Sequence, residues 1–292
     1  MGEQRTPSVR VTTAGLTDVG LVREQNEDAF VTIDLDRNDR GASVGINQWD
    51  IAGRGVLLAV SDGLGGHNAG EVASAMTLEA LVEALEQSHE DDGQAVIHAV
   101  EQASERVREA GHDPAHEGMA ATLTMVLLQP GAVYVAEVGD SRAYLLRRGQ
   151  FCQVTRDQSF VQLMVDQGLL TQAQAERSSQ RNVVLQVMGQ ARGLRVALGK
   201  LALRQGDRLV LCSDGLSNEL SAEEICRLGS DEGGVDHACR ALLQAALERG
   251  ARDNVTVVVA QVDGALPPDR RSEAPCESLE VLQEFTPADR GR

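Results

Sequence analysis

Apolar residues along the chain follow two kinds of pattern, short continuous runs and longer stretches with helical spacing. Short runs rich in Val, Leu and Ala predict buried strands at 9–16, 29–34, 55–61, 121–128, 132–138, 143–147, 151–154, 195–202, 208–213 and 255–262. Stretches with an apolar residue every three or four positions predict helices at 69–87, 94–110, 221–228 and 235–248. Strands and helices therefore come in groups, which predicts an α+β fold rather than alternating βαβ units.

Three segments break this pattern. Residues 36–53 are rich in Asp, Asn, Arg and Gly and predict a long loop or hairpin extension. Residues 159–178 predict two short helices joined at Gly168. After Gly264 the composition shifts to Pro, Arg, Glu and Asp. We therefore expect one domain over 1–264 and a polar, mobile C-terminal tail over 265–292, whose apolar residues Leu279, Val281, Leu282 and Phe285 could dock weakly on the domain.

Composition narrows the class of protein. The 292 residues are 42% hydrophobic but only 2% aromatic, so the core must consist of aliphatic side chains. The formal net charge of −17 argues against nucleic acid or an anionic membrane as a partner, because both would repel the chain. No apolar run is long enough to span a bilayer, and the N-terminus has no apolar signal segment. We expect a cytoplasmic monomer.

The cysteines show no metal-binding or disulfide pattern. There is no Cys-x-x-Cys pair and no even-numbered framework. We interpret them as small core residues or idle thiols in a reducing compartment. They stand at positions 152, 212, 226, 239 and 276.

Acidic turns at the ends of apolar runs carry the candidate chemistry. They occupy 60–66, 138–142, 212–216 and 252–256, and a fifth acidic cluster at 26–28 precedes an apolar run. A single Asp-Gly pair usually marks only a turn. This chain has two Ser-Asp-Gly segments and three further carboxylates at strand ends, which turns alone do not explain well. Oxygen ligands without a His cluster or Cys pairs predict a Mg²⁺ or Mn²⁺ site.

The motifs around these turns resemble the metal-dependent Ser/Thr protein phosphatases of the type 2C (PPM) family in its bacterial form. The resemblance covers roughly residues 10–262, with the motifs in family order. They are Gly15–Gly20, Arg23–Asp28, Ser61–His67, Ala121-Thr122, Gly139–Ala143, Ser213–Leu216 and Asp253–Thr256.

The resemblance implies a four-layer α-β-β-α sandwich of two antiparallel sheets flanked by helix pairs. It also implies two tightly bound Mn²⁺ or Mg²⁺ ions and a third, weaker one. Asp62 would bridge the two ions, with the Gly63 carbonyl on one of them. Asp214 and Asp253 would bind the other.

The remaining site residues also follow from the resemblance. Asp28 and Glu27 would act near the ions, Glu27 through water. Asp140 would share the third ion with Asp214, and Arg23 would grip the substrate phosphate.

Two departures from the family pattern affect these expectations. Leu64 stands where eukaryotic members carry a His that is a candidate general acid, so protonation of the leaving group is unassigned. The segment 156–189, which corresponds to the mobile flap of the family, lacks two His residues that bacterial relatives often carry. This departure concerns substrate preference rather than catalysis.

The resemblance predicts hydrolysis of phosphoserine and phosphothreonine in proteins by a metal-activated water. The expected partners are phosphorylated proteins, namely a Ser/Thr kinase or its substrates. Two alternatives remain, a pseudophosphatase that binds phosphoprotein without hydrolysis and a small-molecule phosphoesterase. A pseudophosphatase usually lacks a metal-binding Asp, and here all are present. A phosphate-cradling Gly-rich loop before a helix, which would favour the second alternative, is not found in the sequence.

Overall fold

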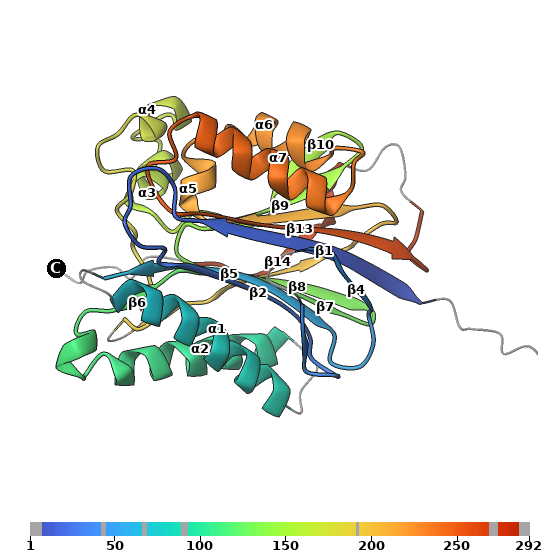
Figure 1. The fold of residues 1–292 in the computed structure, drawn as a ribbon, viewed down its shortest axis with the longest axis horizontal. Coiled ribbons are helices and arrows are strands. Elements are labelled where there is room, and N and C mark those ends of the chain that lie inside the picture. The colour runs from blue at the N-terminus through green and yellow to red at the C-terminus, as the bar shows by residue number, and fades with distance from the viewer. Residues whose placement is uncertain are drawn as a thin grey trace, which may run out of the picture.

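A computed structural model describes residues 8–41, 45–65, 69–88, 93–190, 193–268 and 274–285. Two antiparallel sheets stack face to face, and helices cover the outer face of each sheet (Figure 1). This four-layer arrangement confirms the predicted fold class. The apolar runs of the sequence form its central strands, as expected from their Val and Leu content.

The first sheet has six strands and is centred on a long pairing between the two ends of the domain. Val9 pairs with Gly264 and Asp18 with Val255 in one ten-residue antiparallel ladder. The strands in order are β10 (Gln150–Gln153), β9 (Arg142–Arg147), β12 (Arg208–Cys212), β13 (Val255–Gly264), β1 (Val9–Asp18) and β4 (Asn47–Asp50).

The second sheet has eight strands, and its central strands are almost completely buried. Its order is β14 (Leu279–Gln283), β11 (Ala197–Leu201), β8 (Ala132–Val138), β7 (Leu123–Gln129), β5 (Val56–Leu64), β2 (Asp28–Asp34) and β3 (Asp39–Arg40). The short strand β6 (Ala120–Ala121) pairs with the end of β5.

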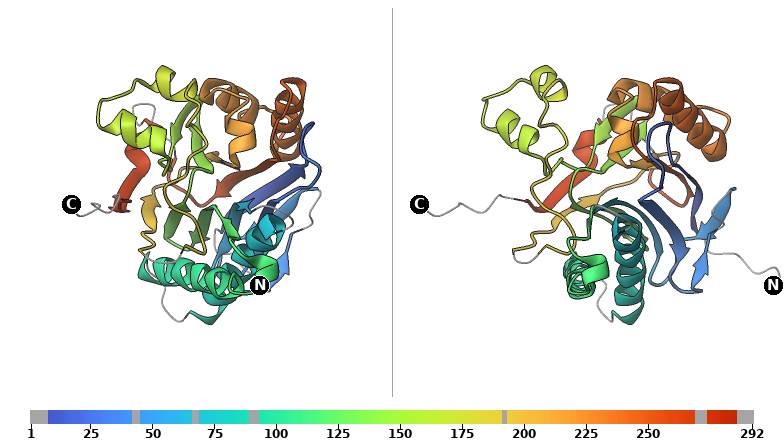
Figure 2. Two further views of the ribbon diagram at one scale, coloured as in Figure 1. Left: turned by 90° about the vertical axis from the view of Figure 1, so that its left-hand side faces the viewer. Right: turned by 60° about the vertical axis from the view of Figure 1, so that its left-hand side comes forward.

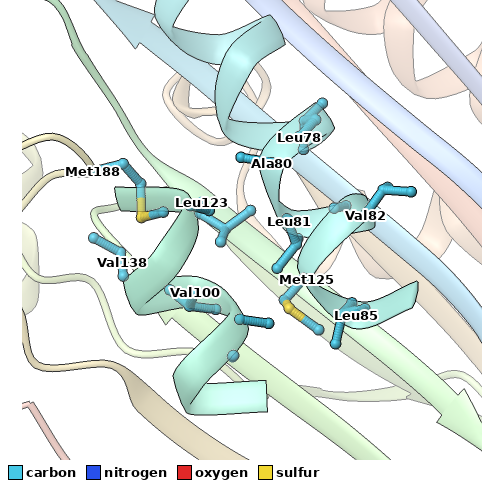
Figure 3. Close-up of a cluster of buried hydrophobic side chains, with 14 of the residues drawn as sticks. Leu78, Ala80, Leu81, Val82, Leu85, Val100, Leu123, Met125, Val138 and Met188 are labelled. Atoms are coloured by element: carbon cyan, nitrogen blue, oxygen red, sulfur yellow. The ribbon is translucent and has the colours of Figure 1, made fainter. Parts of the chain in front are cut away.

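The helices fix the two sheets by covering their outer faces. The pair α1 (Ala69–Gln87) and α2 (Gly93–Ala110) packs Leu81, Val100 and Met125 into one buried cluster with the second sheet (Figure 3). On the other side lie α5 (Asp214–Ser217), α6 (Ala222–Gly229) and α7 (Val235–Glu248). A third aliphatic cluster fills the space between the sheets. No described helix is both long and apolar enough to cross a membrane.

The segment 156–189 projects from this body as a separate lobe (Figure 2). It holds the two predicted short helices, α3 (Phe160–Asp166) and α4 (Gln172–Glu176). Its ends are pinned by isolated bridges between Ser159 and Val184 and between Ala121 and Met188. A short 3₁₀ turn, η1 (Pro114–His116), links α2 to β6.

The predicted loop at 36–53 contributes two short strands instead. The β4 strand pairs with β1, and β3 pairs with β2, so the segment bridges the edges of both sheets. The only Trp, Trp49, is buried there and donates its indole N–H to Asp39 Oδ2 at 3.1 Å. The sequence does not predict these strands, because they are only two and four residues long. Both also lie at sheet edges, where polar residues are tolerated.

The expectation of a mobile tail needs correction for residues 274–285. A second 3₁₀ turn, η2 (Pro275–Ser278), leads into β14, which pairs with β11. Cys276 forms a disulfide with Cys152 on β10, so these two cysteines are not the idle thiols predicted from the sequence. The other three cysteines are buried and free, as predicted.

The C-terminal segment also covers a buried ion pair. Arg147 donates from Nε and Nη2 to the two carboxylate oxygens of Asp207 at 2.8 and 2.7 Å, and from Nη1 to Ser278 Oγ at 2.7 Å. The side chains of Arg147 and Asp207 are 2% and 1% exposed. The stability of the protein therefore depends on keeping both charges paired, since a buried charge left without its partner is strongly destabilising.

We expect Arg147→Ala to lower the free energy of unfolding by about 3–5 kcal/mol, because it leaves the Asp207 carboxylate buried and unpaired. Urea unfolding followed by circular dichroism measures the change. The matched control is Arg240→Ala, which removes a surface pair with Asp236 and should leave the free energy of unfolding nearly unchanged. Equal effects of the two substitutions would contradict the assignment.

Candidate metal centre

The acidic residues of the second sheet meet at the ends of two neighbouring strands. Asp62 lies near the end of β5 and Asp28 begins β2, and the two are direct cross-strand partners. The backbone of Asp62 is fixed further by Thr122, whose Oγ1 accepts from Asp62 N at 3.0 Å and whose N–H donates to Asp62 O at 2.8 Å. The sheet itself therefore holds both carboxylates in place.

Two further carboxylates come from the first sheet. Asp214 begins α5 directly after β12, and Asp253 lies in the turn before β13. Ser213 links this sheet to the second one, since its hydroxyl donates to Asp28 Oδ2 at 2.6 Å and accepts from Thr256 N at 3.0 Å. The candidate centre thus lies where the same ends of the two sheets face each other.

Asn254 fastens the 19–27 loop to the turn that carries Asp253. Its amide nitrogen donates to the carbonyl oxygens of Val19 and Gln25 at 3.0 and 2.9 Å. Its Oδ1 accepts from Glu27 N at 2.8 Å. One neutral side chain therefore places Glu27 beside the other acidic residues.

Arg23 reaches the acidic residues from this loop. Its Nη2 donates to Asp253 Oδ2 at 2.8 Å, and its side chain is 49% exposed. The hydrogen bond that Arg23 donates to Asp253 is the main reason that the pKa of Arg23 is raised. The structure therefore pairs Arg23 with a predicted metal ligand.

Asp140 lies in the turn between β8 and β9, and it is 8% exposed. The nearby Arg142 forms a fork with Asp157, donating from Nη2 at 2.6 Å and from Nε at 2.9 Å. The Asp157 carboxylate is therefore occupied by this ion pair. The N-cap of α3 is Ser159, whose hydroxyl accepts from Gln162 N at 3.3 Å.

The glycines after the acidic residues are required by close approach of the backbone. A Cβ at Gly63 would lie 2.1 Å from Gly70 O, in the first turn of α1. A Cβ at Gly215 would lie 1.9 Å from Asn254 O. Any side chain would push these segments apart, so the two Asp-Gly pairs let helix α1 and the 253–254 turn approach the carboxylates.

Burial and mutual repulsion raise the pKa of these carboxyl groups. The pKa of Asp28 rises to about 7, that of Asp140 to about 8 and that of Asp214 to about 6, with burial as the main cause. The pKa of Asp62 lies well above its usual range for the same reason, and four neighbouring Asp residues add to the shift. The groups are close enough to oppose one another's ionisation.

Two buried oxygens of this cluster have no hydrogen-bond partner among the described residues, Asp28 Oδ1 and Asp214 Oδ1. Buried carboxylate oxygens normally have partners, so these two are free to bind a cation. Oxygen donors of this kind suit Mg²⁺ or Mn²⁺. Within the described ranges, however, no three acidic, His or Cys side chains already enclose a metal position. The ligand assignments therefore stay predictions.

Three positioning residues were not singled out from the sequence. Ser213 and Thr122 appear only as neighbours of the acidic motifs, and Asn254 only as part of one. The sequence does contain one signal for such residues, a Ser directly before each Asp-Gly pair. In the structure both of these residues, Ser61 and Ser213, are completely buried and hydrogen bonded. His67 lies outside the described residues.

Comparison with protein families gives one match that covers most of the chain. The family described as "Protein phosphatase 2C" matches residues 37–259. Two curated relatives come from bacteria. The serine/threonine protein phosphatase PstP of Mycobacterium tuberculosis is 38% identical over 229 residues. The protein phosphatase PhpP of Streptococcus pneumoniae is 31% identical over 252 residues.

The extent of these matches differs. The PstP match covers 77% of this chain but 44% of that protein, so the chain spans less than half the length of the mycobacterial relative. The PhpP match covers 85% of this chain and 96% of that protein. A solved structure, the catalytic domain of PstP in complex with two manganese ions, is 33% identical with a TM-score of 0.71, and covers 88% of this chain and all of that one.

We expect metal-free protein to lose stability as the pH rises from 5 to 8. The carboxyl groups above have a higher pKa in the folded chain than the ordinary 3.8, so the folded state binds more protons than the unfolded state in this range. The loss should be on the order of several kcal/mol, since one pKa unit corresponds to about 1.36 kcal/mol, and less than the sum of the separate shifts because the groups are coupled. Urea unfolding in EDTA at several pH values measures it.

Asp140→Asn should reduce this slope, because it removes one of the carboxyl groups with a raised pKa. The control is Asp236→Asn, which changes a surface carboxylate paired with Arg240 and should leave the slope as it is. A free energy of unfolding that stays level or rises from pH 5 to 8 in EDTA would show that the cluster does not titrate as described.

Proposed function

The chain belongs to the protein phosphatase 2C family, and we propose that it hydrolyses phosphoserine and phosphothreonine in proteins with bound Mn²⁺ or Mg²⁺. One observation supports this most directly. Buried carboxylates from both sheets converge, and two of their oxygens have no partner among the described residues. Such an arrangement is costly without cations and favourable with them.

We propose the following roles for the acidic residues. Asp62 would contribute to both of two ions, the Gly63 carbonyl to one of them, and Asp214 and Asp253 would hold the other. Asp28 and Glu27 would act next to the ions, Glu27 through water. Asp140 would hold a third, weaker ion together with Asp214. When bound, the ions supply an activated water and neutralise charge on the phosphoryl group.

The side chains of the protein then bind and orient the substrate. Arg23 presents a planar pair of donors at the exposed rim of the cluster and grips the phosphate. Asn254 and Ser213 keep the acidic residues in place without adding positive charge. Phosphoryl transfer depends mainly on positioning and charge neutralisation, which these residues provide.

The same proposal covers the partners and the extent of the domain. The substrates are phosphorylated proteins, with a Ser/Thr kinase or its targets among them, and the protein acts as a cytoplasmic monomer. The chemistry resides in residues 1–264. A pseudophosphatase is less favoured, because each acidic position that the family uses is filled here.

We expect turnover of para-nitrophenyl phosphate, and then of a phosphothreonine peptide, to require added Mn²⁺ or Mg²⁺ and to stop in EDTA. Thiol alkylation should leave activity intact, since the free cysteines are buried. Burial raises the pKa of the Cys212 and Cys239 thiols to about 12, which keeps them unreactive. Full activity in metal-stripped protein would overturn the proposal. Hydrolysis of para-nitrophenyl phosphate without any phosphopeptide turnover would favour a small-molecule phosphoesterase.

We expect Asp62→Ala and Asp214→Ala each to reduce kcat by at least about 100-fold at saturating Mn²⁺, because each removes a ligand that holds the ions. Circular dichroism should show that the fold persists, since removing one carboxylate relieves repulsion in the cluster. Asp236→Ala, on the surface of α7, is the control and should keep wild-type kinetics. A variant at Asp62 or Asp214 with near-wild-type kcat would refute its assignment.

We expect Arg23→Ala to raise KM for a phosphopeptide more than it lowers kcat. Loss of a charge-assisted bidentate contact should cost about 1.5–3 kcal/mol in kcat/KM. Arg23→Lys should recover only part, because a point charge cannot hold two oxygens in one plane. Steady-state kinetics of both variants measure these effects.

The control for Arg23 is Arg10→Ala. The side chain of Arg10 is 50% exposed, and its Nε lies 3.7 Å from Asp50 Oδ1. Arg10 therefore resembles Arg23 in exposure and in having an acidic partner. Its loss should leave kcat/KM unchanged. If Arg23→Ala behaves in the same way, Arg23 is a surface ion pair and not a phosphate ligand.

A further inference from the structure

The Cys152–Cys276 disulfide joins the C-terminal segment 274–285 to the body of the domain across 124 positions of sequence. The two cysteine residues differ in exposure. Cys152 on β10 is buried, at 6% exposure, whereas Cys276 in η2 is exposed. Cys276 is therefore the residue of the pair that faces solvent.

The segment covers three features of the domain. Its strand β14 occupies the outer edge of β11, from Leu201 opposite Leu279 to Leu198 opposite Gln283. Its Ser278 accepts a hydrogen bond from Arg147, which forms the buried ion pair with Asp207. It also forms one wall of a cavity of about 650 Å³.

The opposite wall of this cavity belongs to the projecting lobe. Leu279, Val281 and Phe285 line one side, and Gln162 and Leu163 of α3 line the other. Figure 2 shows β14, in red, beneath the helices of the lobe, in yellow-green. The position of the C-terminal segment therefore determines whether this side of the lobe is backed by protein or by solvent.

Little of the side-chain surface of the segment is buried. Of residues 274–285, only Pro275 and Ser278 are buried. Val281 and Leu282 remain 54% and 45% exposed. A short edge strand with so little buried apolar surface opens readily by itself, so the disulfide supplies much of its attachment.

We propose that Cys152–Cys276 is a thiol–disulfide exchange site at which a dithiol reductant frees the C-terminal segment from the edge of β11. A thiolate of the reductant attacks Cys276 Sγ, the S–S bond breaks, and Cys152 leaves as a thiolate that takes up a proton. The second thiol of the reductant then attacks the mixed disulfide and releases Cys276. Two electrons and two protons pass to the protein, and the reductant becomes a disulfide.

Release of the segment changes the surface beside the lobe. The outer edge of β11 loses its hydrogen-bonded partner, and the cavity loses the wall formed by Leu279, Val281 and Phe285. The acidic residues of the candidate metal centre lie on other strand ends and are not part of this change. The exchange site thus stands independently of the proposed phosphatase activity.

The test is hydrogen–deuterium exchange of the full chain before and after treatment with dithiothreitol. Peptides from 274–285 and from β11 should exchange at least about tenfold faster after reduction, because a locally opened edge strand loses its protection. Peptides from β13 should not change, which shows that the core stays folded. Mass spectrometry should find a peptide containing Cys152 linked to one containing Cys276 before reduction, and an alkylated Cys276 afterwards.

Two variants complete the experiment. Cys276→Ser should show the fast exchange without reductant and should not respond to it. Cys226→Ser, which removes a free cysteine, should respond like the wild type. If Cys276→Ser fails to fold, the comparison of wild type with and without reductant still decides. A missing Cys152–Cys276 linkage, or equal exchange of 274–285 in both states, overturns the proposal.

Discussion

Mutual repulsion among buried carboxylates is the constraint on which this structure depends. Asp28, Asp62, Asp140 and Asp214 all have raised pKa values, because burial and like charge oppose their ionisation. Their like charge opposes their close approach. Their positions come from the ladders of two sheets, and the covering helices and aliphatic clusters stabilise those ladders.

The links between the two sheets are mostly neutral, and this preserves the negative charge of the cluster. Ser213 and Asn254 connect the acidic turns through hydroxyl and amide hydrogen bonds. Arg142, which is close in sequence to Asp140, is engaged by Asp157 instead. A cationic link in place of Ser213 would neutralise Asp28, and the cluster would then have less affinity for a metal ion.

Sequence reasoning predicted the central strands and the long helices because their apolar runs are continuous or clearly periodic. It missed β4, α5 and β14, which are four or five residues long and partly polar. Such elements depend on partners distant in sequence, as β14 depends on β11 and on Cys152. The acidic turns were visible because Asp-Gly pairs recur after strands. The ion pair between Asp157 and Arg142 was not visible, because Arg142 lies at the start of β9, 15 residues before Asp157.

The pairing of Arg23 with Asp253 indicates how phosphate and metal binding can depend on each other. In the structure the Arg23 guanidinium donates to the Asp253 carboxylate. A metal ion on Asp253 would weaken this ion pair, because the carboxylate charge would then be shared with a divalent ion. Arg23 is half-exposed and carries little packing, so it can turn toward a phosphate at small cost. Metal binding would thereby make the phosphate-binding donors available, and the same arginine would stabilise the acidic turn when no metal is bound.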